Sequence, residues 1–420
     1  MSSPSISVRC DERGRIAERT LNFGGESEIR RYAYDSAGRL ARVTDGSGGL
    51  LESYQYDHQG RRLADINPQR FRGERRYSYL SGNRLGQAGS VQYSHDKAGF
   101  RNLKVEATSS NPRETRYQYE PSGLLLAVEL PEGRRIEYTH DAKGQRTEKR
   151  MDGRLVEVYR WLDALRLEEF FDGTRWWRLA YDSERPGRGS RTPVGVTNGD
   201  DSYLLCCDQV GTPLTLVTVD GHIVQKMQYD SFGNQLQVRG EVVRLPFGFA
   251  GGLFDADTGL TRFVWRDYDA DTGRFTALDP MGAKGGDDDW YGYCVDDPVN
   301  RVDAWGLWSL FGFGAEEQKS DEENTEQSRT DRDDNPYCKV YPCDDNGTMQ
   351  GDYKPIDIHP GAKPFLLDFS APVPKSVTDF LGMTSKDDTK EKRVPLLPDP
   401  LVYPFEKIYE RNKEAQGDGK

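Results

Sequence analysis

The feature that most constrains the fold of this chain is a motif of two tyrosines, an aspartate and a glycine that recurs about once every 22 residues. Its clearest copies are YAYDSAGRL at residues 32–40 and YQYDHQGRR at residues 54–62. Weaker or later copies contain Tyr77, Tyr93, Tyr117, Tyr138 and Tyr229. Internal repetition with such a period is typical of stacked or wound β architectures, in which each repeat packs on its neighbours.

Each copy of the motif reads as one β-hairpin. The Tyr-x-Tyr alternation has the two-residue period of a strand. The Asp-x-x-Gly that follows is typical of a turn, because aspartate can bond its own backbone and glycine accepts a positive φ. A second strand then leaves the turn, as in residues 38–43. One hairpin cannot bury a face by itself, so we expect the hairpins to stack into a mainly β fold.

Composition narrows the functions that this chain can have. Its 420 residues carry a formal net charge of −12, which argues against a chain that coats nucleic acid along its whole length. A local basic site for nucleic acid is still compatible with this charge. The N-terminal residues lack the basic and apolar regions of a secretory signal. No window reaches the roughly 18 apolar residues of a membrane span. We therefore expect synthesis in the cytoplasm, no membrane span, and export by a route without an N-terminal signal.

The last part of the chain differs in composition from the repeats. Residues 316–334 are almost wholly polar and predict a solvated linker. Residues 335–420 contain eleven prolines and only short apolar patches, such as FLL at residues 365–367. This composition predicts a small domain with few long elements, or a segment that folds with a partner.

The most specific segment of the sequence is residues 248–307. In order, it contains GFAGGL (248–253), DTGL (257–260), RDYD (266–269), TGRF (272–275), DPMG (279–282), YGY (291–293), DDPVN (296–300) and DAWGL (303–307). This series closely resembles the conserved core end of the RHS/YD-repeat family. With the repeats, the resemblance extends across about residues 1–307.

The resemblance implies a division of the chain into four parts. Residues 1–247 would wind YD-repeat hairpins into a spiral β-sheet shell. The repeat region is short for the family, which leaves open whether the shell closes or stays partial. Residues 248–307 would form the RHS repeat-associated core end that plugs the shell. Residues 308–334 would be an acidic polar linker, and residues 335–420 a variable, toxin-like C-terminal domain of unknown fold.

The resemblance also implies a function. It suggests a polymorphic toxin for bacterial competition or host killing, synthesised in the bacterial cytoplasm and delivered into target cells. Proteins of the family are often delivered by type VI secretion or as part of Tc-type insecticidal toxins. The partners implied are a cognate immunity protein and a secretion apparatus with its adaptor or chaperone.

Self-cleavage after the core end is a further implication of the resemblance. The family's aspartic-protease-like pair corresponds here to Asp279 and Asp303, and the scissile bond to Leu307–Trp308. Two neighbouring carboxylates do not both ionise readily, so one holds a proton while the other activates water. Ala304 stands where the family has proline, which makes the turn before the scissile bond less rigid.

The same residues also have simpler interpretations. Asp279 and Asp303 can act only as turn residues that bond the backbone, as aspartate commonly does. Asp297 is a competing partner for the pair. Arg266 either orients a carboxylate or lies on a strand surface.

The tail offers few candidates for chemistry. Asp357 and His359 lie close in sequence and form a candidate general-base pair for a nuclease or a transferase, against the alternative of an exposed loop histidine. Cys338 and Cys343 would need two more ligands to hold zinc, so we expect no metal and no cofactor.

A second hypothesis places the chain in a different functional class. Tyrosine-rich sheet faces suit stacking on sugars, because each tyrosine presents an apolar ring with a polar tip. The alternative function is therefore a non-enzymatic module that binds carbohydrate or a partner surface and carries an inert tail.

Overall fold

The computed structural model describes the repeat region and the core end almost continuously. The described residues are 5–23, 25–108, 110–181, 191–280, 288–307 and 365–368. Among them the regular structure is β-strand, with only three-residue 3-10 turns in place of helices. These turns are η1 (Ser81–Asn83), η2 (Phe249–Gly251) and η4 (Cys294–Asp296). The predicted mainly β fold is confirmed.

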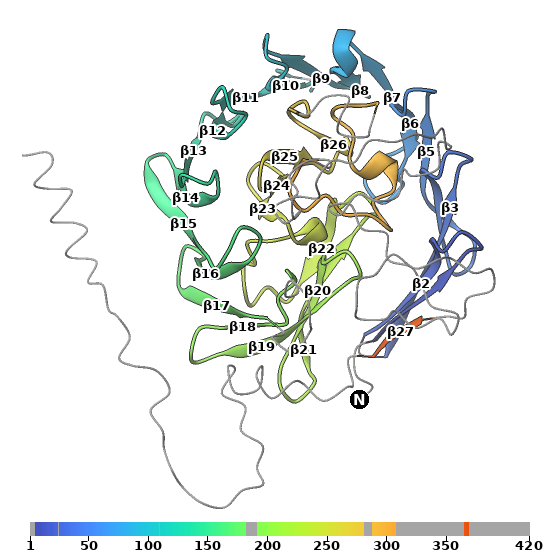
Figure 1. Cartoon of the computed structure of the whole chain (residues 1–420), viewed down its shortest axis with the longest axis vertical. Coiled ribbons are helices and arrows are strands. Elements are labelled where there is room, and N and C mark those ends of the chain that lie inside the picture. Colours follow the sequence, from blue (N-terminus) through green and yellow to red (C-terminus); the bar gives the residue numbers. More distant parts are fainter. Residues whose placement is uncertain are drawn as a thin grey trace, which may run out of the picture. The chain divides into compact units, whose positions relative to one another are not determined.

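Most strands belong to one antiparallel sheet of 23 strands (Figure 1). Its members are β1 (Ser5–Cys10), β2 (Ile16–Phe23), β3 (Glu26–Tyr34), β4 (Leu40–Asp45), β5 (Leu50–Tyr56), β6 (Arg62–Ile66), β7 (Glu74–Tyr79), β8 (Leu85–Ala88), β9 (Val91–His95), β10 (Arg101–Glu106), β11 (Arg113–Tyr119), β12 (Leu125–Glu129), β13 (Arg135–His140), β14 (Arg146–Met151), β15 (Arg154–Trp161), β16 (Leu167–Phe171), β17 (Trp176–Ala180), β18 (Gly195–Thr197), β19 (Ser202–Cys207), β20 (Pro213–Val217), β21 (Ile223–Tyr229), β22 (Gln235–Arg239) and β27 (Phe365–Asp368).

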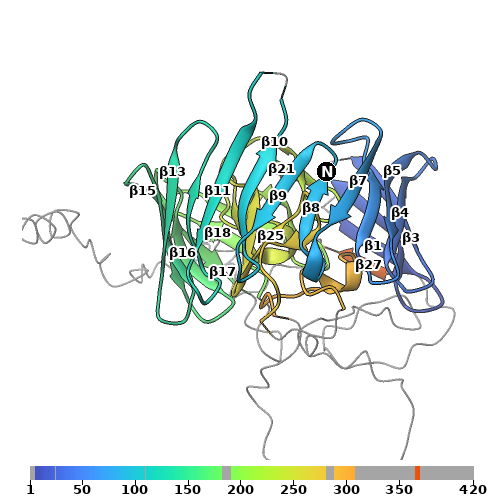
Figure 2. The ribbon, with the colours of Figure 1, turned by 90° about the horizontal axis from the view of Figure 1, so that it is seen from above.

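The sheet is a meander that curls on itself. From β1 to β22, each strand pairs antiparallel with the next strand along the chain. In Figure 1 the hairpins follow one another around the core-end segment, and Figure 2 shows them standing side by side. This arrangement confirms the predicted spiral β-sheet.

The turn chemistry predicted from the motif is also confirmed. In the second copy, the Oδ1 atom of Asp57 accepts hydrogen bonds from the backbone N–H of Gln59 and of Arg61, both at 2.9 Å. The N–H of Gly60 donates to the carbonyl of Asp57 at 3.2 Å, and Gly60 has a φ of 82°. Glycine is favoured there because an L side chain strains the left-handed backbone region.

The motif also connects neighbouring hairpins. The Tyr56 hydroxyl donates to the carbonyl of Leu40 in the preceding hairpin at 2.9 Å. The guanidinium of Arg39 pairs with Asp35 at 2.7 Å and lies 4.8 Å from the centre of the Tyr56 ring. Tyr54, the first tyrosine of the same copy, points inward and is buried. One tyrosine therefore fills the interior and the other ties one repeat to the previous one.

The core end forms a second, smaller sheet. It contains β23 (Leu253–Asp255), β24 (Leu260–Phe263), β25 (Arg266–Asp269) and β26 (Arg274–Phe275), each antiparallel to the next. In Figure 1 this sheet lies inside the curve of the large one. Its apolar cluster is aromatic and includes Phe249, Phe263, Tyr268, Phe275 and Tyr293.

Buried ion pairs join the core end to the inner face of the large sheet. The ammonium of Lys149 on β14 lies 2.8 Å from Asp255. Arg101 on β10 lies 2.5 Å from Asp269. Buried charges are costly unless they are paired, so these contacts fix the register of the core end against the shell.

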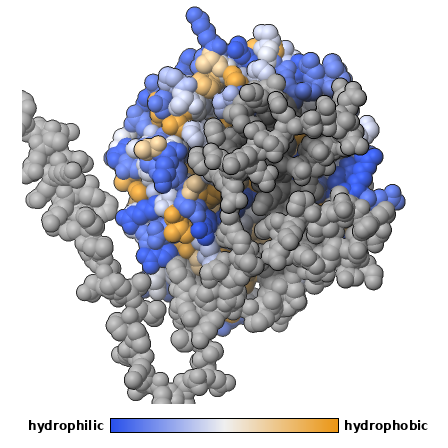
Figure 3. Space-filling model, in the orientation of Figure 1, coloured by the Kyte–Doolittle hydropathy of each residue, from blue (hydrophilic) through white to orange (hydrophobic). Residues whose placement is uncertain are grey.

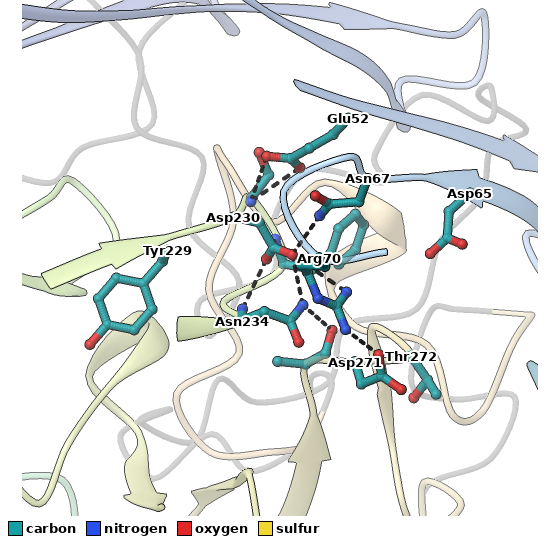
Figure 4. A network of polar contacts seen from close by, with 12 residues as sticks. Glu52, Asp65, Asn67, Arg70, Tyr229, Asp230, Asn234, Asp271 and Thr272 are labelled. Atoms are coloured by element: carbon teal, nitrogen blue, oxygen red, sulfur yellow. Dashed lines mark hydrogen bonds and ion pairs between the residues drawn. The ribbon is translucent and has the colours of Figure 1, made fainter. Parts of the chain in front are cut away.

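A further polar network joins the turn after β6 to the turn after β21 and to the core end (Figure 4). Asn67 donates to Asp230 at 2.9 Å, and Arg70 lies 3.5 Å from the same carboxylate. Arg70 also pairs with Asp271 in the core end. Burial first, and then the charge of Asp230, raise the pKa of Glu52, which lies beside this network.

The two ends of the large sheet meet through side chains, and no backbone pairing joins β22 to β1 among the described strands. Lys226 on β21 lies 2.7 Å from Glu26 on β3, and Arg19 on β2 lies 3.3 Å from Asp208. A cavity of about 450 Å³ lies between these ends. The closure is therefore partial, which answers a question that the sequence left open.

The exposed surface of the described hairpins is mainly polar. On the face seen in Figure 3, hydrophilic residues dominate and hydrophobic ones are scattered. In the part of the chain that the structure describes, no helix has the length and apolar character needed to cross a bilayer.

Candidate functional site

The candidate site is built around Arg266, the first residue of β25. Its side chain is buried, with 3% of its area exposed, and its guanidinium lies 3.7 Å from the centre of the Phe275 ring on β26. Pairing of β25 with β24 and β26 fixes the backbone on both sides. The interpretation of Arg266 as a strand-surface residue is wrong, because its strand belongs to the enclosed sheet.

Arg266 brings the two predicted aspartates together. Its Nη2 atom lies 3.0 Å from Oδ2 of Asp279 and 3.5 Å from Oδ2 of Asp303. Both aspartates are almost fully buried. Two acidic side chains that are distant from Arg266 in sequence thus share one guanidinium nitrogen.

Other donors of Arg266 bind the segments that carry the aspartates. Its Nε atom donates to the carbonyl of Gly306, and Nη1 donates to the carbonyl of Trp290 at 3.1 Å. The N–H of Asp279 in turn donates to the same Trp290 carbonyl at 2.8 Å. One buried cation therefore holds three chain segments around the two carboxylates.

The electrostatics distinguish Asp303 within this group. The pKa of Asp303 is raised to about 6, first by burial and to a lesser extent by the charge of the neighbouring Asp279. The charge of Arg266 and the N–H of Leu307 act in the opposite direction. Asp303 can therefore exchange a proton near neutral pH, which a carboxyl group in water does not do.

The residue before the predicted scissile bond is bound directly to Asp303. The N–H of Leu307 donates to Oδ1 of Asp303 at 3.1 Å, and Leu307 is buried. Gly306 has a φ of 66°, and a Cβ atom there would lie 2.7 Å from the carbonyl oxygen of Phe263. Glycine is thus needed in the Asp303–Leu307 segment. Trp308 lies outside the described residues.

The contacts of the two aspartates fit both interpretations, a catalytic pair and turn residues that bond the backbone. Asp303 accepts a backbone hydrogen bond, as a turn aspartate does, and it also lies beside Asp279 and Arg266. The assignment of Asp279 and Asp303 as catalytic residues stays a prediction.

Asp297, the competing candidate, has a different set of neighbours. Its Oδ1 atom accepts a hydrogen bond from Nδ2 of Asn300 at 2.8 Å. Asn300 also donates to the hydroxyl of Tyr34 at 2.8 Å and accepts from the N–H of Ile16 at 2.8 Å. Burial raises the pKa of Asp297 to about 6. Through Asn300, this aspartate fastens the core end to the first hairpins.

The tail candidates Asp357 and His359 lie outside the described residues, as do Cys338 and Cys343. The carbonyl of Trp290 and the N–H of Leu307 are contacts that the sequence argument missed. No local sequence pattern predicts these contacts, because Trp290 and Arg266 come together only when the core end folds.

Residues 1–284 match the family model described as Teneurin YD-shell. Teneurin-3 of Danio rerio is 28% identical over 282 residues, which cover 65% of this chain and 10% of that protein. The probable deoxyribonuclease RhsB of Dickeya dadantii (strain 3937) is 28% identical over 313 residues, which cover 67% of this chain and 21% of that protein. The chain thus spans about a tenth to a fifth of the length of these relatives.

Among solved structures, the crystal structure of TcdB2-TccC3-Cdc42 is similar to this chain, with a TM-score of 0.47 and 14% identity. The match covers 72% of this chain and 17% of that one.

Proposed function

The chain belongs to the Teneurin YD-shell family and is an RHS/YD-repeat protein, and from this premise we propose that it is an RHS-type toxin protein whose β-shell carries a C-terminal effector. Its role would be bacterial competition or host killing after delivery into a target cell, with type VI secretion as one route. A cognate immunity protein and an adaptor or chaperone would be its partners. The relatives that support a toxin are the probable deoxyribonucleases RhsA and RhsB of Dickeya dadantii.

We further propose that the core end cuts the chain after Leu307. The observation that carries this proposal is the shared contact of Asp279 and Asp303 with Nη2 of Arg266, next to the backbone of Leu307. The tail, with Asp357 and His359 as its candidate residues, would be the released effector.

The proposed reaction is hydrolysis of the Leu307–Trp308 peptide bond. Asp279, which lies 3.0 Å from Arg266, takes a proton from water as the water oxygen bonds to the carbonyl carbon of Leu307. Asp303, whose pKa is raised to about 6, gives its proton to the nitrogen of Trp308 as the C–N bond breaks. The products are a carboxylic acid on Leu307, which then loses its proton to solvent, and an amine on Trp308. Asp279 is left protonated and Asp303 ionised, and the proton on Asp279 passes to solvent.

Intact-mass measurement on purified full-length protein tests this reaction. Wild type should separate into fragments that end at Leu307 and begin at Trp308. Asp279→Asn and Asp303→Asn should each stay whole, whereas Asp257→Asn should cut like wild type. Asp257 is a suitable control because it is an acidic residue of the same core end whose carboxylate pairs with Lys149 and Arg244.

An intact wild type after days at pH 6 would contradict self-cleavage. A chain that stays whole, with a tail tolerated by cells that express it, would favour the non-enzymatic module that binds carbohydrate or a partner. Binding of the wild-type protein on a glycan array would then be the next measurement.

A further inference from the structure

The first strand of the large sheet is paired on both of its edges. β1 pairs with β2 along one edge, and along the other it pairs antiparallel with β27, which comes from the tail. The register sets Ser5 opposite Asp368 and Val8 opposite Phe365. Figures 1 and 2 both show β27 beside the first strands of the sheet.

The sequence of β1 explains why this edge needs a partner. Ile6 and Val8 point inward and are almost fully buried, while Ser5 and Ser7 alternate with them. The strand has no proline and no inward charge, which are common devices that protect a sheet edge from pairing. Without β27, the edge would present a row of backbone N–H and C=O groups to any extended peptide.

The sequence around β27 limits what the edge can hold. Pro364 directly precedes the strand, and Pro372 follows it by four residues. Proline has no N–H and interrupts a ladder, so the tail offers only a short strand between them. Its four residues match the four paired positions of β1.

We propose that the outer edge of β1 is a docking site for an extended peptide strand, and that residues 365–368 of this chain occupy it because the chain connects them to the shell. A four-residue strand pairs weakly by itself. A covalent connection makes the pairing intramolecular and raises the effective concentration of the strand at the edge. Cys10, the last residue of β1, is disulfide-bonded. Once that disulfide is reduced, cutting the chain between the shell and the tail therefore releases residues 365–368 and uncovers β1.

In the cell, the release of β27 from β1 would rest on the proposed self-cleavage, since the Leu307–Trp308 bond lies between these two strands in the sequence. The docking itself does not depend on that reaction. An experiment can separate the two by cutting the chain with an added protease at a recognition sequence placed in the linker, residues 316–334.

Amide hydrogen exchange of the full-length protein measures whether the edge is covered. In intact protein, edge-facing amides of Ser5–Cys10 should exchange at least about tenfold more slowly than in a Leu366→Pro variant, whose proline breaks the added strand. A Val377→Pro variant, changed in the same tail outside the strand, should behave as wild type. After the protease cut under reducing conditions, wild-type β1 should exchange as fast as Leu366→Pro, and the tail should elute separately.

Equal exchange in intact wild type and Leu366→Pro would overturn the docking site. A cut tail that still elutes with the shell would overturn the role of the covalent connection. Failure of self-cleavage with β1 still protected would remove the proposed reaction and leave the docking site in place.

Discussion

Arg146 on β14 lies 3.1 Å from Asp267 on β25, and the side chains of both residues are 2% exposed or less. Asp267 also forms an ion pair with Arg262 of the neighbouring strand β24, at 2.7 Å. One buried carboxylate therefore balances two buried guanidinium groups, one from the shell and one from the core end. This pairing is a strong constraint on how the core end sits within the large sheet.

Replacing Asp267 by Asn should destabilise the protein by about 3–5 kcal/mol, because two buried cations lose their shared counterion. The change in the free energy of unfolding is measured by urea denaturation of the purified protein. Arg76→Ala is the matched control, since its side chain is 85% exposed in a surface pair and its loss should cost less than about 0.5 kcal/mol. A loss below about 1 kcal/mol for Asp267→Asn would contradict the constraint.

Two turn glycines should differ in their response to alanine. Gly60 and Gly233 have φ values of 82° and 92°, so both alanine variants strain the backbone by about 1–2 kcal/mol. A Cβ at Gly60 meets nothing within 4 Å, whereas one at Gly233 would lie 2.2 Å from Cγ of Phe249. Gly233→Ala should therefore lose about 1–3 kcal/mol more than Gly60→Ala in thermal or urea unfolding. Equal losses would show that Phe249 moves away at no cost.

The hydroxyl of Tyr56 should contribute to stability through its bond to the carbonyl of Leu40. Tyr56→Phe should cost about 1 kcal/mol of unfolding free energy, since it leaves a buried carbonyl without this donor. Tyr203→Phe removes a hydroxyl that makes no hydrogen bond among the described residues and should change stability by less than about 0.5 kcal/mol. The same urea titration compares both variants, and equal effects would argue against a role for the motif tyrosine.

Stability should depend on pH through Asp297. Burial raises its pKa from 3.8 to about 6 in the folded state, so its ionised form opposes folding above pH 6. That penalty is relieved as the pH falls through 6 and is absent below the unfolded-state pKa. The melting temperature of wild type minus that of Asp297→Asn should therefore rise from pH 8 to pH 5. A constant difference across this range would contradict the raised pKa.

The proposed self-cleavage should be faster in mild acid. Asp303 must hold a proton, and its pKa is raised to about 6 mainly by burial. Its protonated fraction falls as the pH rises, so the rate should drop about 50-fold between pH 6 and pH 8. Densitometry of fragment formation over time gives the rate at each pH. A rate that rises toward pH 8 would assign the proton to another group.

The sequence was sufficient for features that depend on neighbouring residues. The turn at Asp57–Gly60 closes with hydrogen bonds that span at most four residues. The residue types within the turn are therefore enough to predict it in each copy of the motif. The alternation of tyrosines likewise predicts a strand, and the series of motifs at residues 248–307 identifies the family. The aspartates of the candidate site were found in that way.

Only the tertiary structure decided which charges meet. Arg101 and Arg146 occupy the same place in their repeats, two residues after the turn glycine, yet they pair with Asp269 and Asp267 respectively. The sequence left open whether Arg266 orients a carboxylate or lies on a strand surface, and the structure buries it beside two aspartates. Such contacts join residues far apart in the chain, and their energy depends on burial, which arises only when the hairpins curl around the core end.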